Sequence, residues 1–337
     1  MLDWLTEVGM ILVTGGAGYI GSHTVKLLLE SGCDVVTYDS MELGHPEAIV
    51  GGAIIRGDLL DRPKLDSAFN DFPIDAVIHF AAYASVGDSV ANPDKYFHNN
   101  TCGGLNLLNA MRAAGVDKII FSSSAATYGE PHHVPIEEEH PQSPTNPYGE
   151  TKLMFEKILK WYDVAYGMKS ISLRYFNAAG ADPDGRIGED HDPEEHLIPI
   201  VLKTALGQRD KVRVFGTDWD TPDGTCIRDY IHVTDLSDAH ILALRALESD
   251  VQTTAYNLGN GDGHSVMKVI RTAEEVVGRK IPWDPAPRRP GDPARLVASS
   301  EKLKRELGWR PRFPELSVII ETAWRWHSSH PNGYAKQ

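Results

Sequence analysis

The stretch Thr14-Gly15-Gly16-Ala17-Gly18-Tyr19-Ile20-Gly21 decides the fold that this sequence predicts. It lies between an apolar run at Met10–Thr14, typical of a buried strand, and a helical pattern at Ile20–Glu30. Glycines in such a turn permit a tight bend, let the backbone approach a pyrophosphate and let the helix pack on the strand. Gly15, Gly18 and Gly21 have the spacing of a dinucleotide-binding fingerprint. The sequence therefore predicts a dinucleotide whose pyrophosphate lies at the helix N-terminus.

Short β-branched runs alternate with helical patterns along the first half of the chain. The expected strands are Met10–Thr14, Asp34–Asp39, Ala53–Gly57, Ala76–Phe80, Lys118–Ser123 and Lys169–Arg174. The expected helices are Ile20–Glu30, Pro63–Phe69, Pro93–Ala114 and Tyr148–Tyr166. This alternation predicts an α/β fold of Rossmann type, a doubly wound parallel sheet with helices on both faces.

The pattern changes after Asn177. Ala181–Glu195 is rich in Asp, Gly and Pro and indicates a long loop. Helical patterns follow at Leu236–Leu247, Val266–Val277 and Leu316–Ser328. We expect residues 1–178 to form the dinucleotide-binding domain, with residues 1–9 as an extension, and residues 179–337 to form a smaller C-terminal α/β substrate domain. Ligands of such sheets bind at the carboxyl ends of the strands, so the cleft between the domains is the expected site.

The composition is that of a folded, acidic protein. The chain has 337 residues, of which 42% are hydrophobic, and 33 Lys+Arg against 47 Asp+Glu give a net charge of −14. This charge disfavours nucleic acid as a partner. Apolar runs stay far below the ~20 residues of a membrane span. Cys33, Cys102 and Cys226 are too few and too widely spaced for a disulfide framework, and the N-terminus lacks a signal-peptide pattern, so a cytoplasmic protein is expected.

An acidic residue closes the second predicted strand. Asp39 lies 18 residues after Gly21, where a carboxylate accepts hydrogen bonds from a ribose diol. It would repel a 2′-phosphate, and residues 40–50 hold no Lys or Arg to accept one. The sequence therefore favours NAD over NADP. Asp58, after the third predicted strand, is placed to reach the adenine edge.

Tyr148 and Lys152 have a spacing that puts both on one face of a helix. A phenol with a pKa of about 10 is a poor base at neutral pH. A nearby ammonium or a cationic nicotinamide stabilises the phenolate. Ser124, upstream in Ser122-Ser123-Ser124, can share the proton. These three residues, following the glycine turn, predict a catalytic proton-transfer set.

Several stretches carry a resemblance to a known family. They are Gly15–Thr24, His79–Ala82, Phe121–Gly129, Arg174–Gly180, Asp223–Val233, Tyr256–Gly259 and Arg288–Asp292. Through them nearly the whole chain is similar to the extended short-chain dehydrogenase/reductase family, and within it to enzymes that epimerise UDP-hexoses at C4. The resemblance implies reversible 4-epimerisation of UDP-glucose and UDP-galactose, through a transient 4-keto intermediate and a bound NAD. It also implies a homodimer.

The resemblance assigns roles to further residues. NAD would also contact Tyr19, Ile20, Leu59, Phe80, Ala81, Ala82, Asn99, Tyr148, Lys152 and Tyr175. The UDP-sugar would be held by Ser124, Tyr148, Asn177, His196, Leu197, Phe215, Arg228, Arg289 and Asp292. Arginine forks suit a diphosphate, and a carboxylate suits a ribose diol. The chain departs from many relatives at Ala84, where they have Lys, and from some at His196, where they have Asn.

Leu296 falls where the resemblance places a gate beside the C2 substituent of the sugar. A large Tyr at that place is associated with plain hexoses, and a smaller residue admits N-acetylated sugars. Leucine is intermediate in size. UDP-N-acetylhexosamines and UDP-pentoses therefore stay open as alternative substrates.

The residues after Ser124 bear on the type of reaction. Similar dehydratases and decarboxylases carry an acid at this place, whereas this chain has Ala125 and Ala126. Without that acid, epimerisation is favoured. A net oxidoreductase and a non-catalytic NAD-sensing protein are the competing functions. No metal is expected, because neither His132-His133 nor the pair His191 and His196 matches HExxH or a paired Cys/His spacing.

Overall fold

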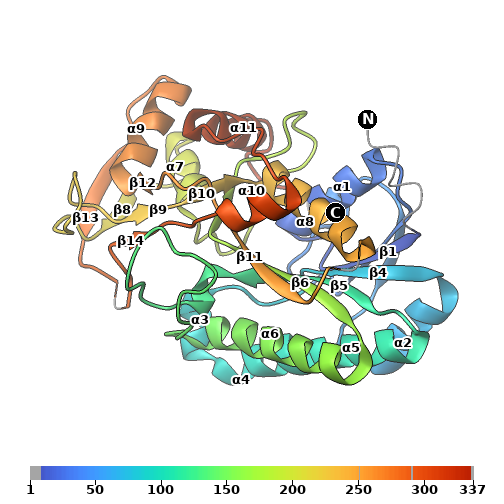
Figure 1. The fold of residues 1–337 in the computed structure, drawn as a ribbon. Coiled ribbons are helices and arrows are strands. Elements are labelled where there is room, and N and C mark those ends of the chain that lie inside the picture. Colours follow the sequence, from blue (N-terminus) through green and yellow to red (C-terminus); the bar gives the residue numbers. More distant parts are fainter. Residues whose placement is uncertain (1–8, 250, 290, 335–337) are drawn as a thin grey trace. The chain divides into compact units, whose positions relative to one another are not determined.

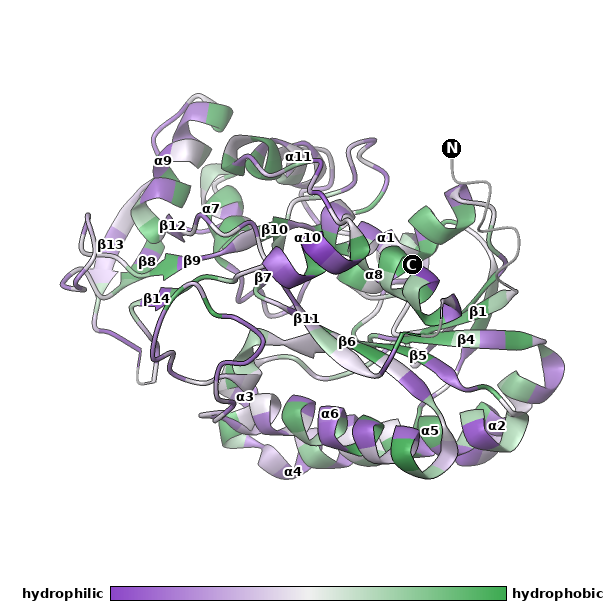
Figure 2. Ribbon diagram, in the orientation of Figure 1, coloured by the Kyte–Doolittle hydropathy of each residue, from purple (hydrophilic) through white to green (hydrophobic). Residues whose placement is uncertain are grey.

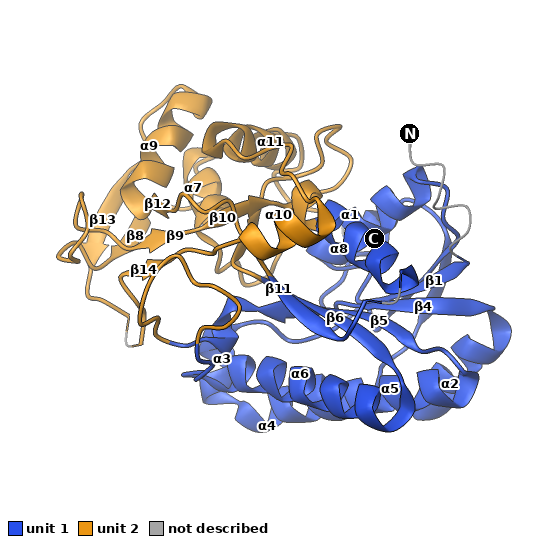
Figure 3. Ribbon diagram, viewed as in Figure 1, with its two compact units in different colours: residues 1–129, 141–174, 237–256 blue, residues 130–140, 175–236, 257–337 orange. Residues whose placement is uncertain are grey.

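The computed structural model describes residues 9–249, 251–289 and 291–334, so the predicted N-terminal extension lies, apart from Gly9, outside the described residues. The chain divides into two compact units (Figure 3). The first comprises the chain up to residue 129 together with residues 141–174 and 237–256. The second comprises residues 130–140, 175–236 and the chain from residue 257 onward. The predicted boundary at residue 178 lies near one change of unit. However, residues 130–140, which precede it, belong to the second unit, and residues 237–256, which follow it, belong to the first.

The first unit is built on a seven-stranded sheet with the order β11-β6-β5-β4-β1-β2-β3 in the described chain (Figure 1). The strands are β1 (Met10–Thr14), β2 (Val35–Asp39), β3 (Ala53–Arg56), β4 (Ile74–His79), β5 (Lys118–Ser124), β6 (Lys169–Tyr175) and β11 (Thr254–Leu258). β1 pairs in parallel with both β2 and β4, so the strand order reverses there. Ligands of such sheets bind at this switch point. The Rossmann-type prediction is confirmed; β11 was not predicted.

Helices cover both faces of this sheet. They are α1 (Tyr19–Glu30), α2 (Arg62–Asp71), α3 (Val86–Ala91), α4 (Pro93–Tyr96), α5 (Gly104–Ala114), α6 (Pro147–Tyr166) and α8 (Val233–Glu248), with 3-10 turns at Pro46–Ala48 and Ala125–Thr127. Figure 1 shows α2, α5 and α6 on one face and α1 on the other. The single helix expected over Pro93–Ala114 is wrong in part, because a π-helical turn at Phe97–Gly103 separates α4 from α5.

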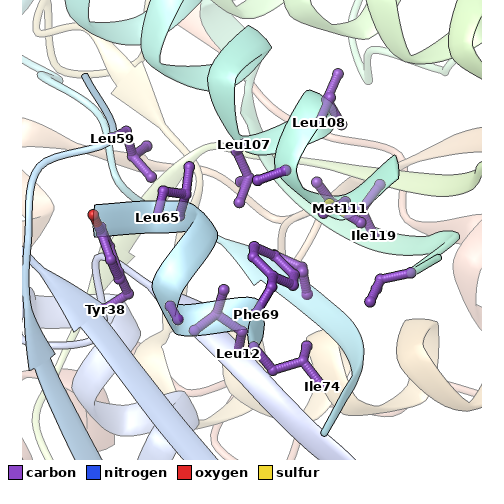
Figure 4. Packing of buried hydrophobic residues seen from close by; sticks show 14 of the residues in the cluster. Leu12, Tyr38, Leu59, Leu65, Phe69, Ile74, Leu107, Leu108, Met111 and Ile119 are labelled. Atoms are coloured by element: carbon purple, nitrogen blue, oxygen red, sulfur yellow. The ribbon is translucent and has the colours of Figure 1, made fainter. Parts of the chain in front are cut away.

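One hydrophobic core of the first unit lies between the sheet and α2, α5 and α6. Figure 2 shows α5 and α6 alternating between hydrophobic and hydrophilic residues, the pattern of helices with one buried face. Figure 4 shows Leu65 and Phe69 of α2 facing Leu107 and Met111 of α5. Each such side chain, once buried, contributes about 1.5–3 kcal/mol. This packing holds the strand ends that carry the site.

The second unit contains short strands and four helices in its described part. The strands are β7 (Asn177–Ala179), β8 (Val212–Phe215), β9 (Ile227–Arg228), β10 (Tyr230–His232), β12 (His264–Ser265), β13 (Trp283–Ala286) and β14 (Arg295–Leu296). The helices are α7 (Leu197–Ala205), α9 (Val266–Val277), α10 (Glu301–Leu307) and α11 (Leu316–Ser329). α7, α9 and α11 share one hydrophobic core. Throughout the described ranges, each helix is too short or too polar to cross a membrane.

Candidate active site

The glycine turn between β1 and α1 has the geometry that its spacing predicts. Gly15 has φ +74°, and a Cβ there would lie 2.5 Å from the backbone nitrogen of Ala81. A Cβ at Gly21 would lie 2.1 Å from the oxygen of Gly15. At Gly18, the N-cap of α1, a Cβ would meet only that oxygen, at 3.4 Å, and no side chain of the described residues caps the helix. The uncapped helix N-terminus fits a pyrophosphate.

Asp39 lies at the end of β2, and its carboxylate faces this turn. Its Oδ2 accepts a hydrogen bond from the amide of Ala17 at 3.0 Å, and its Oδ1 accepts one from Met41 at 2.8 Å. Two backbone donors therefore fix the carboxylate beside the glycine turn. The combination of an open helix N-terminus and a fixed acid at the end of β2 fits the pyrophosphate and ribose of NAD.

The other predicted NAD contacts follow strand ends of the same sheet. Tyr38 donates a hydrogen bond to the backbone oxygen of Asp58 at 2.9 Å, which holds the exposed Asp58 beside the buried Leu59. The amides of Phe80 and Ala81 donate to the oxygen of Thr14 at 2.8 and 3.1 Å. These bonds bring the loop after β4 next to the glycine turn. Tyr19 and Ile20 begin α1, Ala82 continues the β4 loop, and Tyr175 ends β6.

The first turn of α6 carries the predicted catalytic pair. Asn146 caps the helix by accepting a hydrogen bond from the amide of Gly149 at 2.9 Å. A Cβ at Gly149 would lie 2.4 Å from the backbone oxygen of Ala126, so glycine is needed for this approach. The approach brings Tyr148 within hydrogen-bonding reach of Ser124. The structure therefore unites the three residues that the sequence proposed as catalytic.

Burial controls the protonation of Tyr148 and Lys152, whose exposed fractions are only 8% and 3%. Desolvation raises the pKa of Tyr148, and its hydrogen bond with Ser124 partly opposes the rise. Desolvation lowers the pKa of Lys152 to about 7, although the negative charge of Glu156 acts to raise it. Its ammonium donates to the backbone oxygen of Ser122 at 2.7 Å and lies 5.8 Å from the Tyr148 ring centroid. A cationic nicotinamide would supply the charge that a phenolate needs here.

A buried ion pair that the sequence analysis missed supports this set. Arg174 binds Glu156 with two parallel hydrogen bonds, from Nε at 2.9 Å and from a terminal nitrogen at 2.6 Å. Ser123 donates to the same carboxylate at 2.6 Å, and Arg174 also donates to the Tyr128 hydroxyl at 2.7 Å. Glu156 lies one turn after Lys152, and Ser123 precedes Ser124. The pair therefore joins the two elements that carry the catalytic residues.

Asn100, in the π-helical turn, is a second residue that the sequence analysis missed. Its amide donates to the oxygen of Tyr83 at 3.0 Å and to the Thr151 hydroxyl at 3.1 Å, and its oxygen accepts from the Tyr83 amide at 2.9 Å. Asn99 donates to the same oxygen at 3.0 Å. Asn100 thus ties the loop after β4 to α6. The only signal in the sequence was the Asn99-Asn100 pair.

Several residues predicted to hold the UDP-sugar gather in the second unit. Arg228 on β9 donates to the carboxylate of Asp292 at 2.6 Å. Leu296 on β14 is the direct parallel partner of Arg228. Next to Arg228 in the chain, the buried Asp229 accepts hydrogen bonds from three backbone amides, including that of Ala298 at 3.0 Å. The carboxylate therefore fixes the strands that carry Arg228 and Leu296.

The remaining predicted substrate residues lie on other elements of the second unit. The guanidinium of Arg289 lies over the ring of Phe215, 4.1 Å from its centroid. Asn177 on β7 donates to the oxygen of Asp229 at 2.8 Å. His196 precedes α7, and Leu197 begins it. A cation stacked on an aromatic ring offers both a charge and a flat face to a nucleotide.

Known proteins match nearly the whole chain. A family model described as the NAD dependent epimerase/dehydratase family matches residues 11–259. The UDP-glucose 4-epimerase of Halalkalibacterium halodurans is 56% identical over 327 residues, which cover 97% of this chain and 98% of the relative.

Two solved structures have the same fold. One crystal structure of a UDP-glucose 4-epimerase has a TM-score of 0.96 and 53% identity, covering 97% of this chain and 100% of its own. The UDP-glucose 4-epimerase of Bifidobacterium longum, in complex with NAD+ and UDP, has a TM-score of 0.91 and 40% identity, covering 96% and 100%. The glycine turn, the fixed Asp39 and these matches together show that the chain belongs to the NAD dependent epimerase/dehydratase family.

Proposed function

We propose that this protein is a UDP-glucose 4-epimerase that interconverts UDP-glucose and UDP-galactose with NAD as its cofactor. The observation that carries the proposal is the buried set of Ser124, Tyr148 and Lys152 in a chain 56% identical to such an enzyme over almost its full length. The non-catalytic alternative is not favoured, because all three residues are present. Alanines after Ser124 favour epimerisation over dehydration.

NAD would be held by the glycine turn, by Asp39 at the ribose and by the loop after β4. When bound, it would supply reversible oxidation and reduction at C4 of the sugar. Tyr148, as a phenolate, takes the proton of the sugar 4-hydroxyl and later gives it back. Ser124 shares this proton through its hydrogen bond with Tyr148. Lys152, anchored on the oxygen of Ser122, stabilises the phenolate by its charge when it is protonated.

The second unit would hold the UDP-sugar. Arg228 and Arg289 suit the diphosphate, because a guanidinium fork pairs with two phosphate oxygens. Phe215 offers its ring to the uracil, and Asp292 offers its carboxylate to the ribose diol. Asn177, His196 and Leu197 complete the proposed contacts. Holding the substrate by its diphosphate leaves the sugar ring free to present either face to Tyr148.

The test of this function uses purified protein and UDP-galactose with no added NAD, and follows UDP-glucose over time. Many turnovers per chain are expected, because the cofactor is regenerated in each cycle and stays bound. Stoichiometric release of NADH would instead identify a net oxidoreductase. No conversion by protein that holds NAD would reject the hexose substrate.

Leu296 tests the alternative substrates. Replacing Leu296 by Tyr adds bulk at the proposed C2 gate, so turnover of UDP-N-acetylglucosamine is expected to fall by at least about 10-fold while that of UDP-glucose changes little. The measurement is kcat/KM for both substrates in wild type and variant. Leu316→Met, a volume-conserving change in the core of α11, is the control. An unchanged substrate ratio would remove the gate argument.

We propose that the enzyme acts as a homodimer through α6. Its location in the cytoplasm stays a prediction from the sequence. Trp161 and Val164 on this helix are 71% and 76% exposed, and Met154, seven residues before Trp161, is also exposed. Exposed apolar side chains gathered on one helix mark an interface. Trp161→Glu is expected to shift the sedimenting species from dimer to monomer, whereas the same change at Trp283 in the second unit leaves the dimer intact. A dimeric Trp161→Glu variant would contradict this interface.

A further inference from the structure

Four side chains with metal-binding groups converge in the segment before α7. They are Glu189, His191, Glu194 and His196, and one ligand atom of each lies within 4.8 Å of the others. All four belong to the second unit. They supply two carboxylate oxygens and two imidazole nitrogens from a run of eight residues. This donor set is one that Zn²⁺ accepts.

The distances between these atoms are close to those of a tetrahedral site. The Nδ1 of His191 lies 3.3 Å from Oε1 of Glu189 and 4.0 Å from Oε1 of Glu194. The Nδ1 of His196 contacts Oε1 of Glu189 directly and lies 4.0 Å from Oε1 of Glu194. Ligands bound to zinc at 2.0–2.2 Å in a tetrahedron lie about 3.3–3.6 Å apart. The separations of 3.3 and 4.0 Å lie at or just above that spacing.

The two carboxylates are both buried, and that of Glu194 is only partly hydrogen-bonded. Glu189 is 3% exposed and Glu194 is 6% exposed. The Oε2 of Glu194 accepts no hydrogen bond from any described residue, and the ammonium of Lys203 lies 3.8 Å from it. A buried carboxylate oxygen without a hydrogen bond costs free energy. A divalent cation between the two carboxylates would remove that cost.

Neighbouring groups hold the cluster in place. The amide of His196 donates to Oε1 of Glu194 at 3.0 Å, and the indole of Trp326 donates to the backbone oxygen of Glu189 at 3.3 Å. The amide of Tyr334 donates to the carboxylate of Asp190 at 2.9 Å. Outer-shell bonds of this kind orient metal ligands. The segment is therefore fixed to α11 and to the chain beyond it.

We propose that Glu189, His191, Glu194 and His196 bind a divalent transition-metal ion of the Zn²⁺ class. Four protein ligands close a tetrahedron, so the site is structural and leaves no position for a reacting water. The proposal replaces the sequence-based prediction of no metal, which weighed only the HExxH motif and paired Cys/His spacings and did not include Glu189 or Glu194. It does not depend on the proposed catalytic residues, and it reassigns His196 from a sugar contact to a metal ligand.

The experiment uses the full-length protein, stripped with EDTA and returned to a buffer that does not chelate metals. Calorimetric titration with ZnCl₂ is expected to show one ion per chain, and ZnCl₂ is expected to raise the unfolding midpoint. Titration with CoCl₂ is expected to give the strong visible absorption of tetrahedral Co²⁺. The double variant His191→Ala/Glu194→Gln is expected to lose more than about 100-fold in affinity, since outer-shell changes alone cost up to that factor.

The matched control is His133→Ala/Glu137→Gln, which makes the same chemical changes at two exposed positions of the second unit. It is expected to bind zinc as the wild type does. Wild-type protein that binds no stoichiometric zinc, or a double variant that binds as tightly as the control, would overturn the site. If the double variant does not fold, the wild-type cobalt spectrum decides, and a weak octahedral spectrum rejects the proposal.

Discussion

Replacing Tyr148 by Phe is expected to lower kcat by about 100- to 10,000-fold, the range in which a positioned general acid–base contributes. Phenylalanine keeps the ring in its buried position and removes only the hydroxyl that hydrogen-bonds with Ser124. The glycine turn and Asp39 are untouched, so NAD should remain bound. The measurements are kcat with UDP-galactose and the NAD content of the purified protein.

Tyr162→Phe is the control for this change, because it removes a hydroxyl from the same helix. That hydroxyl donates to Asn109 at 3.0 Å and touches none of the proposed catalytic residues. Its kcat is expected to stay close to that of the wild type. If Tyr148→Phe keeps a tenth or more of the wild-type kcat, Tyr148 is not the base. If it also loses NAD, the residue shapes the cofactor site.

Replacing Glu156 by Gln is expected to reduce the free energy of unfolding by about 3–5 kcal/mol, because it removes the carboxylate that pairs with the buried charge of Arg174. Glu156 and Arg174 are 3% and 4% exposed. The carboxylate raises the pKa of Arg174 through its hydrogen bonds and its charge, which outweigh desolvation. Urea unfolding of the wild type and the variant measures the loss.

Two further variants test whether the loss of stability comes from the burial of the pair or from the loss of any ion pair. Glu248→Gln breaks the half-exposed pair with Lys118 at 2.7 Å and is expected to cost less than about 1 kcal/mol. The double variant Glu156→Gln/Arg174→Met removes both buried charges and should recover much of the stability. A Glu156→Gln variant no less stable than Glu248→Gln would show that Arg174 finds another partner.

Replacing Glu156 should also change the pKa of Lys152 in the active site. Its charge raises the pKa of Lys152, which burial lowers to about 7. Without that carboxylate, the pKa of Lys152 falls further, and the ammonium is lost at neutral pH. The pH at which kcat declines should then shift downward, an effect that a purely structural role would not produce.

Local patterns were enough to predict most of the sheet. Six strands were expected to within two residues of their observed bounds, because each is an apolar run next to a turn signal. β11 was missed, because its pairing with β6 joins segments far apart in the sequence. The π-helical turn was missed for a similar reason, since the side chain of Asn100 bonds to Tyr83 and Thr151, which are distant from it in the sequence.

The site shows the same difference between residues that a local pattern predicts and residues that only the fold brings together. The sequence alone predicted the roles of four residues, because their spacing from neighbouring motif residues already implies their chemistry. These residues are Gly15, Asp39, Tyr148 and Lys152. Glu156 and Arg174 lie in ordinary helical and strand patterns, and only folding pairs them. Whether each residue proposed for NAD or the UDP-sugar makes its contact stays a prediction that ligand-bound protein must test.

The return of residues 237–256 to the first unit has a consequence for synthesis of the protein. On the ribosome, the strands up to β6 emerge early, but β11, which pairs with β6, emerges some eighty residues later. Until then, the edge of β6 is an unpaired template on which other chains can add strands. A shortened gene ending at residue 178 would keep the glycine turn and the catalytic residues yet leave that edge permanently open. Such a fragment should aggregate during expression. A fragment ending after residue 258 would contain β11, which covers that edge.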